Sequence, residues 1–149
     1  MVVKIKHLED LLTLHEGLRL NAYDDATGKS IKRGDTLKGN LTIGIGRNLS
    51  SHGLTKREVV TLLKNDIQSA RKKARRYKWF DALNNVRQSV IISLVFNMGN
   101  IDGFKKMRTA ISVKNYELAS VELLDSRYAE QVGDRAIVLA DYLRTGSWD

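Results

Sequence analysis

The chain has 149 residues and a formal net charge of +8 at pH 7, and this length suffices for one domain with a substantial buried core. Hydrophobic residues make up 42% and charged residues 28%, a composition that excludes disordered and fibrous proteins. The lack of cysteine excludes disulfide bonds, thiolate metal sites and a cysteine nucleophile.

The positive charge is concentrated in one stretch. Residues 55–80 contain nine Lys or Arg and two acidic residues, a local net charge of +7, so the rest of the chain is close to neutral. A concentrated positive surface attracts polyanions such as nucleic acid, an anionic membrane or an acidic cell-wall polymer. A solvated helix face without any partner has the same composition.

The sequence shows no pattern of a secretion signal or a membrane span. Its start, MVVKIKHLEDLL, contains lysines but no apolar segment of signal-peptide length, and the longest uninterrupted apolar run covers only residues 136–140. We therefore expect a protein without a leader peptide or a transmembrane segment.

Helical periodicity begins near the N-terminus. Apolar residues at helical spacing predict a helix over 4–15, and Gly17 is a natural stop directly after Glu16. The stretch LTIGIG, 41–46, predicts a strand, preceded by a loop rich in glycine and lysine over 28–40. Predicted β-structure is confined to this short region.

The rest of the chain is predicted to be helical. Thr55 and Glu58 have the spacing of a capping box and predict the start of a long helix over 55–77, which carries the basic residues. The stretch NVRQSVIISLVFNM, 85–98, is apolar on nearly every side and predicts a helix buried on most faces. Shorter helices are predicted over 105–113, 115–124 and 134–144.

Two carboxyl groups near the first helix are candidates for acid–base chemistry. Glu16 lies at the predicted helix end, and Asp25 follows in the turn sequence DATG. Hydrolysis of a glycosidic bond needs one carboxylic acid to protonate the leaving oxygen and a second carboxylate to direct water or form a glycosyl intermediate. Glu16 and Asp25 can supply both groups, but a helix-ending glutamate followed by an ordinary turn has the same pattern.

Five blocks of sequence carry a family resemblance. In chain order they are HEGLRLNAYDDATG, LTIGIG, VFNMGNIDGF, SRYAEQVGDRA and RTGSWD. Together they resemble the phage-type lysozymes, glycoside hydrolase family 24, and especially the lysozymes of T-even phages. The resemblance extends nearly from end to end, and the Glu, Asp and Thr of the first two blocks match the family's catalytic signature.

The resemblance implies an α+β, lysozyme-like fold, mostly helical, with a small β-sheet lobe joined by a long helix to a larger helical lobe. Residues 1–149 are then a single two-lobed domain. The small lobe is expected over 17–54, the connecting helix over 55–77 and the helical lobe over 78–149, with helix 4–15 packed on the helical lobe. Substrate is expected in a cleft between the lobes.

The resemblance also implies an activity. The chain is expected to be an endolysin that hydrolyses the β-1,4 bond between N-acetylmuramic acid and N-acetylglucosamine in bacterial peptidoglycan, causing lysis of the host cell. Glu16 is the expected general acid, Asp25 is expected to bind or activate the water, and Thr42 to hold it, with inversion at the anomeric carbon.

Three further residues take supporting roles from the resemblance. Arg135, in the GDRA block, matches the arginine that pairs with the catalytic glutamate, although it also fits a plain surface position. Asn97 and Gln131 are expected to contact sugar.

The insertion 29–40, KSIKRGDTLKGN, departs from the lysozymes of T-even phages, which have a short connection here. It lengthens the spacing from Asp25 to Thr42 by eleven residues. Asp35 within it is a rival for the role of the second carboxylate. Its basic residues suggest a flap over the anionic peptide stems of the wall, and a disordered solvent loop is the alternative.

Arg47 is the second departure, because the lysozymes of T-even phages have a histidine here that pairs with an aspartate on the long helix. The matching aspartate is Asp66. We predict an Arg47–Asp66 ion pair that links sheet and helix without the titration of a histidine near its pKa of about 6.5.

No metal or cofactor is expected, since His7, His15 and His52 lack a metal-binding spacing such as HExxH. Peptidoglycan is the expected partner, with electrostatic contact between the basic 55–78 helix and anionic wall or membrane. The protein is expected to be a monomer without a specific nucleic-acid ligand, held in the host cytoplasm until the membrane is breached. The alternatives are a non-catalytic wall-binding or membrane-disrupting protein, a nucleic-acid-binding protein and a lytic transglycosylase.

Overall fold

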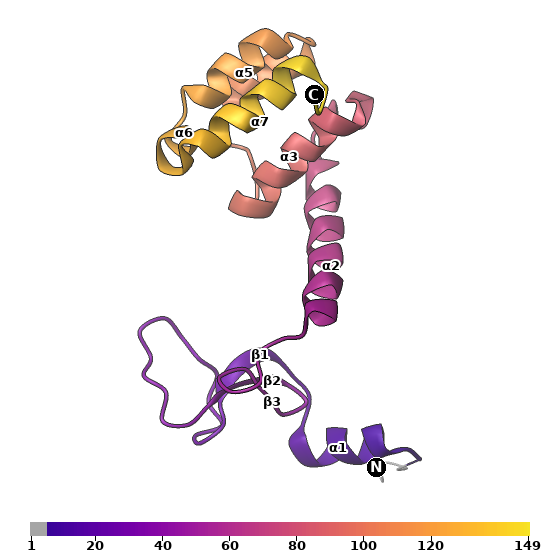
Figure 1. Cartoon of the computed structure of the whole chain (residues 1–149), viewed down its shortest axis with the longest axis vertical. Coiled ribbons are helices and arrows are strands. Elements are labelled where there is room, and N and C mark those ends of the chain that lie inside the picture. Colours follow the sequence, from indigo (N-terminus) through magenta and orange to yellow (C-terminus); the bar gives the residue numbers. More distant parts are fainter. Residues whose placement is uncertain (1–5) are drawn as a thin grey trace. The chain divides into compact units, whose positions relative to one another are not determined.

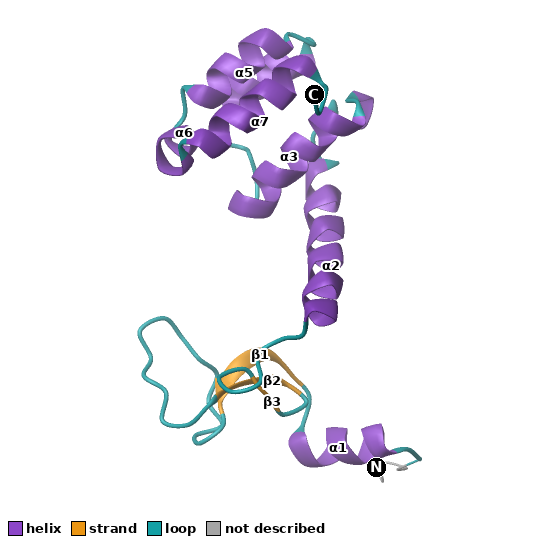
Figure 2. Ribbon diagram, viewed as in Figure 1, coloured by secondary structure: helices purple, strands orange, loops and turns teal. Residues whose placement is uncertain are grey.

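The computed structural model describes residues 6–149. Its elements run in the order α1, β1 to β3, α2, a turn of 3-10 helix η1, Phe80–Ala82, and α3 to α7 (Figure 1). Figure 2 shows the strands together in one small sheet, with helices making up the other regular structure. The predicted α+β, lysozyme-like fold class is confirmed. The chain divides into two compact units, the N-terminal unit Met1–Val59 and the C-terminal unit Val60–Asp149.

Helix α1, Leu8–Glu16, ends where glycine enters the sequence. Gly17 has φ +75°, a conformation that favours glycine, and its amide donates to the Thr13 carbonyl at 3.0 Å. The predicted helix 4–15 is confirmed in its main part and ends one residue later. Its first two residues lie outside the described residues, and the next two are not helical. No residue of α1 is buried.

An antiparallel three-stranded sheet follows, in the order β1-β2-β3. Strand β1 spans Arg19–Asp24, β2 spans Leu41–Gly44 and β3 spans Arg47–Asn48. The predicted strand 41–46 is confirmed as β2 for its first four residues. The chain then turns at residues 45–46, because Gly44 and Gly46 both adopt positive φ and reverse its direction.

Thr42 lies at the centre of this sheet. It pairs with Tyr23 on β1 and with Asn48 on β3, and it is only 3% exposed. The pairing of Asp24 with Leu41 then closes the long connection between β1 and β2. Near the start of this connection, Ser30 also forms an isolated bridge with Tyr23 on β1.

Helix α2, Lys56–Ala74, begins with the predicted capping box. The Glu58 amide donates to Thr55 Oγ1 at 3.2 Å, and the Thr55 amide donates to Glu58 Oε2 at 2.7 Å. The helix ends three residues before the predicted residue 77. Its last turn carries Arg71, Lys72 and Lys73, which interact favourably with the negative end of the helix dipole.

The C-terminal unit consists of helices around one apolar core. Helix α3, Asn85–Met98, has the predicted bounds and supplies six buried residues, as its apolar sequence predicted. The other helices are α4, Lys105–Ser112, α5, Tyr116–Leu124, α6, Arg127–Val132, and α7, Asp134–Thr145. The largest fully buried side chains are Phe80, Ile91, Leu94, Ile101, Met107, Ile111, Leu123 and Leu143.

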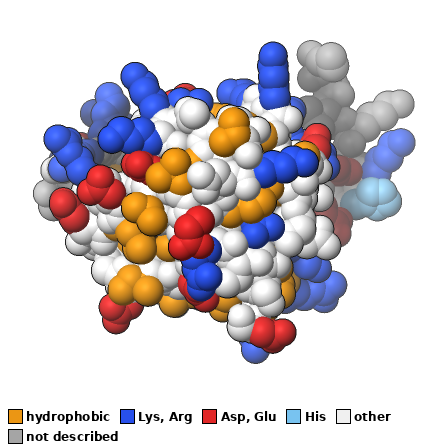
Figure 3. Space-filling view, turned by 90° about the horizontal axis from the view of Figure 1, so that it is seen from above, with side chains coloured by type: hydrophobic (Ala, Val, Ile, Leu, Met, Phe, Trp, Pro, Cys, Tyr) orange, Lys and Arg blue, Asp and Glu red, His pale blue; other side chains and the backbone are white. Residues whose placement is uncertain are grey.

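The surface mixes apolar and charged side chains. Figure 3 shows one face on which basic, acidic and apolar side chains are interspersed. Val121 on α5 and Ile137 and Val138 on α7 are among the exposed apolar residues. Among residues 6–149, no helix combines the length and apolar character needed to cross a membrane.

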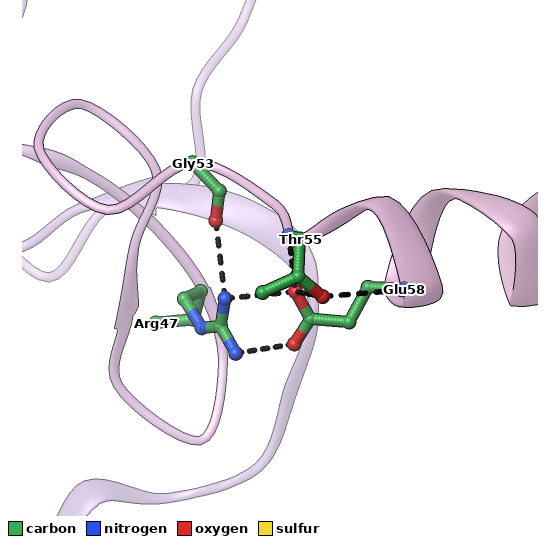
Figure 4. A network of polar contacts seen from close by, with 4 residues as sticks. All are labelled: Arg47, Gly53, Thr55 and Glu58. Atoms are coloured by element: carbon green, nitrogen blue, oxygen red, sulfur yellow. Dashed lines mark hydrogen bonds and ion pairs between the residues drawn. The ribbon is translucent and has the colours of Figure 1, made fainter.

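Arg47 on β3 ties the sheet to the first turn of α2 within the N-terminal unit (Figure 4). Its Nη1 donates to the Gly53 carbonyl and to Glu58 Oε2, both at 3.1 Å, and its Nη2 forms an ion pair with Glu58 Oε1. The predicted ion pair with Asp66 is therefore wrong. The capping box turns the Glu58 carboxylate back toward the residues before the helix, so this group meets the guanidinium fork.

The core of the C-terminal unit gives a prediction of stability. Leu94 is fully buried in α3, so Leu94→Ala should lower the free energy of unfolding by about 2–5 kcal/mol through lost burial and the cavity left behind. Val138→Ala on the exposed face of α7 is the control, with an expected change within about 0.5 kcal/mol. Denaturant unfolding of both variants measures the difference, and equal stabilities would contradict this assignment of the core.

Arg47→Ala should weaken the junction between the sheet and α2, because it removes the two guanidinium nitrogens that contact the Glu58 carboxylate. The expected result is faster amide hydrogen exchange over residues 41–58. Arg144→Ala is the control, since it removes only a surface ion pair with Asp141 on α7. Unchanged protection of residues 41–58 in Arg47→Ala would show that the network contributes no local stability.

Acid should weaken the same junction. The hydrogen bond from Arg47, helped by those from Thr55, lowers the pKa of Glu58 from 4.5 to about 2. A pKa depressed in the folded state stabilises the fold fully above the unfolded value of 4.5, and this contribution disappears as the pH falls from 4.5 to about 2. The stability difference between the wild type and Glu58→Gln should therefore shrink across this window in pH-dependent unfolding, and a constant difference would refute the linkage.

Candidate functional site

Glu16 is exposed at the C-terminal end of α1 and lies against the β2–β3 turn. A Cβ placed on Gly46 would lie 2.9 Å from Glu16 Oε2 and 3.2 Å from its Cδ. Gly46 also has φ +69°, which disfavours any other residue. The carboxyl group of Glu16 therefore lies beside the β2–β3 turn, next to the backbone of Gly46, which has no side chain.

Asp25 is also exposed, and Asn40 contacts both of its carboxylate oxygens. The Asn40 amide donates to Oδ1 at 2.7 Å, and Asn40 Nδ2 donates to Oδ2 at 3.1 Å. In return, the Asp25 amide donates to the Asn40 carbonyl at 3.1 Å. Asp25 and Asn40 thus continue the pairing of β1 with β2 by one position.

Thr42 contacts the same residue. Its hydroxyl donates to the Asn40 carbonyl at 3.2 Å. The sequence places Asp25 and Thr42 on opposite sides of the insertion, and the structure brings both to Asn40. Three predicted catalytic residues, Glu16, Asp25 and Thr42, therefore all contact one small sheet or its turns.

Asp24 is a buried neighbour of Asp25 that sequence reasoning missed. It is 3% exposed, and its carboxylate accepts the amides of Lys38 at 2.6 Å, Ala26 at 2.9 Å and Gly39 at 3.0 Å. The hydrogen bond from Lys38 is the main reason that the pKa of Asp24 is lowered, with those from Ala26 and Gly39 adding to it. The signal was available in the Asp-Asp doublet, but nothing in the sequence told which aspartate turns inward.

Asp35, the rival second carboxylate, has a local structural contact. Its Oδ2 accepts the Lys32 amide at 2.8 Å, and its own amide donates to the Lys32 carbonyl at 3.1 Å. These bonds form a turn inside the insertion. The contacts of Asp35 are those of a turn residue, whereas Asp25 is held at the sheet.

The predicted supporting residues lie in the C-terminal unit. Arg135 is exposed in the first turn of α7, and Asn97 is exposed near the end of α3. Gln131 on α6 lines a surface pocket of about 590 Å³ whose other walls include Phe104 and Tyr128. Asn97 and Arg135 are not among the residues that line this pocket.

Tyr128 is a second residue that the sequence did not single out. It is 5% exposed, and its hydroxyl has no hydrogen-bond partner among the described residues. Its ring packs edge-on against Phe104 with centroids 6.4 Å apart. The pocket wall near Gln131 therefore includes two aromatic residues, and the hydroxyl of one of them, Tyr128, is buried without a partner among the described residues.

The described residues contain no cluster of side chains suited to binding a metal ion. Within 6–149, no group of three or more histidine or acidic side chains is placed to hold an ion. What the N-terminal unit offers instead is two exposed carboxyl groups and a hydroxyl held by hydrogen bonds, the groups used in general acid–base chemistry.

Comparison with known families agrees with this chemistry. The sequence model of the phage lysozyme family matches residues 13–138, which include Glu16, Asp25, Thr42 and Arg135. The match covers most of the chain and spans both units. The chain therefore belongs to the phage lysozyme family, and it is a glycoside hydrolase of the muramidase class whose substrate is peptidoglycan.

Proposed function

We propose that the enzyme cleaves the β-1,4 bond between N-acetylmuramic acid and N-acetylglucosamine, acts as an endolysin and inverts the anomeric carbon. The observation that carries this proposal is the meeting of Asp25 and Thr42 at Asn40. Glu16 lies against the turn that follows the strand of Thr42, so the proposed acid is next to the sheet that carries Thr42.

Glu16 is the general acid in this proposal. It protonates the glycosidic oxygen as the bond to the anomeric carbon breaks, while Asp25 takes a proton from the attacking water. Thr42 holds that water. Inversion requires room for the water between base and sugar, and carboxyl groups about 6.5–9.5 Å apart provide it.

Arg135, Asn97 and Gln131 keep supporting or substrate-binding roles in the proposal. For Gln131 the support is its place in the wall of a pocket large enough for part of a saccharide or a peptide stem. For Arg135 and Asn97 the support is the family resemblance together with their exposure.

The two-lobed division also stays a proposal. It assigns 17–54 to the sheet lobe, 55–77 to the connecting helix and 78–149 to the helical lobe, with helix 4–15 packed on the helical lobe. Leu8, Leu12 and Leu14 on α1 are exposed, which supports a packing partner for this helix.

The proposed cellular route and partners follow from the family. The enzyme remains in the host cytoplasm as a monomer until another protein opens the membrane, and then reaches the wall. The cationic residues of the 55–78 segment support electrostatic contact with anionic wall or membrane, because they far outnumber its two acids.

Substitution of the carboxyl groups tests the chemistry. Glu16→Gln and Asp25→Asn should each lower the rate of peptidoglycan hydrolysis by about 100-fold or more, since each removes a proton-transfer group. Asp35→Asn should retain wild-type activity, because Asp35 forms only a turn. Mass spectrometry of the digestion products identifies the bond cleaved, and full activity of Glu16→Gln would refute the proposal.

The same digests separate the alternatives. A reducing N-acetylmuramic acid end supports hydrolysis, whereas a 1,6-anhydro end would identify a lytic transglycosylase. Undiminished cell lysis by Glu16→Gln would instead favour membrane disruption by the basic helix. Loss of activity in Asp35→Asn with full activity in Asp25→Asn would move the second carboxylate into the insertion.

A further inference from the structure

We propose that Asn40 is a positioning residue that orients both the Asp25 carboxylate and the Thr42 hydroxyl toward the attacking water. The end of the 29–40 insertion, residues 38–40, then supports the hydrolytic site. This inference rests on the proposed function, in which Asp25 and Thr42 direct that water. It concerns Asn40, the last residue of the segment 29–40.

Asn40 fixes the plane of the Asp25 carboxylate. Its backbone amide donates to Oδ1 at 2.7 Å and its side-chain Nδ2 donates to Oδ2 at 3.1 Å, so each oxygen has one donor from the same residue. Two hydrogen bonds from one residue restrict rotation of the carboxylate about the Cβ–Cγ bond of Asp25. A carboxylate has about four lone-pair sites, so each oxygen retains one that can accept a hydrogen from water.

Asn40 also sets the direction of the Thr42 hydroxyl. That hydroxyl has one hydrogen, which it donates to the Asn40 carbonyl at 3.2 Å. The Thr42 oxygen can then act toward a water molecule only as a hydrogen-bond acceptor. Thr42 is 3% exposed, so few other partners compete for this hydrogen.

The Asp25 carboxylate and the Thr42 hydroxyl together set the orientation of the attacking water. A water that donates one hydrogen to Thr42 and the other to Asp25 keeps an oxygen lone pair for the anomeric carbon. As the carbon–oxygen bond to water forms, Asp25 takes the water proton. The bond to the leaving sugar breaks, and the leaving oxygen takes the proton of Glu16.

The backbone beside Asn40 is built for this approach. A Cβ on Gly39 would lie 2.2 Å from Asp25 Oδ1 and 2.8 Å from the Ala26 amide nitrogen, so only glycine lets the chain pass this close. Asp24 accepts the amides of Lys38 and Gly39 at 2.6 and 3.0 Å. The two residues that precede Asn40 are thus held by a buried carboxylate, and this fixes the backbone that leads into Asn40, as a preorganised site requires.

The side chain of Asn40 can be removed with its backbone contacts retained. Asn40→Ala deletes only the donor to Oδ2 and should lower kcat by about tenfold to a hundredfold, since the lost bond is made to a charged group. KM should change little, because Asn40 acts through Asp25 and not on the sugar. Asn40→Asp, which replaces the donor by a like charge, should lower kcat further.

The experiment measures kcat and KM on soluble peptidoglycan chains by the release of reducing ends, with thermal unfolding of every variant recorded in parallel. Asp35→Asn is the matched control, because it removes a hydrogen bond in the same loop and leaves Asn40 in contact with Asp25. A kcat loss in Asn40→Ala that Asp35→Asn does not share, at a temperature where both are folded, supports the inference. Wild-type kcat in Asn40→Ala, or an equal loss in both variants, overturns it.

Asp25→Asn in the same assay separates the two levels of the argument. If Asp25→Asn is inactive and Asn40→Ala is fully active, the proposed function stands and the role of Asn40 is refuted. If Asp25→Asn is fully active, the proposed role of Asp25 fails, and the positioning role of Asn40 fails with it.

Discussion

One buried carboxylate, Asp24, organises the N-terminal unit. Three backbone amides converge on it, two of them from the far end of a long loop, so it closes that loop without apolar packing. Charge-assisted bonds to a carboxylate are about twice as strong as neutral ones, and burial of Asp24 shields them from water. The positions of Gly39 and Asn40, and through them the orientation of Asp25, depend on this closure.

The two units are stabilised in different ways. The C-terminal unit has a continuous apolar core, in which whole faces of α3, α5 and α7 are removed from water. The N-terminal unit buries few side chains and relies on polar contacts: the amides around Asp24, the pair of Asp25 with Asn40, and the junction of Arg47 with Glu58. Polar networks of this kind specify geometry, which suits the unit in which we propose the general acid and the water-directing residues.

The long helices were largely predictable, because α3 and α7 carry apolar patterns and the start of α2 carries a capping box. Helix α6 was missed, since its six residues are too few to show a period. Strand β1, with the sequence RLNAYD, was missed as well. A register irregularity between Arg19 and Tyr23 breaks the alternation that would identify a strand, and β3 has only two residues.

The candidate site was predictable only in part. Glu16, Asp25 and Thr42 emerged because their residue types and the blocks around them resemble a family, and the structure then placed each of them at the sheet. Asn40 and Asp24 escaped notice because their contacts exist only after the loop has closed. The partner of Arg47 was mistaken for a related reason: a residue far along the helix had the right charge, but the capping box presents a nearer carboxylate.

The two ends of the insertion are held by the structure, whereas its central residues 32–37 are exposed. The bridge of Tyr23 with Ser30 holds one end, and the bonds at residues 38–40 hold the other. Lengthening a loop whose ends are already fixed costs little, because the entropy of closure grows only slowly with length. Foreign peptides, such as a cell-surface ligand or an affinity tag, can therefore be grafted into this central part to redirect the enzyme toward other bacteria while its sheet remains intact.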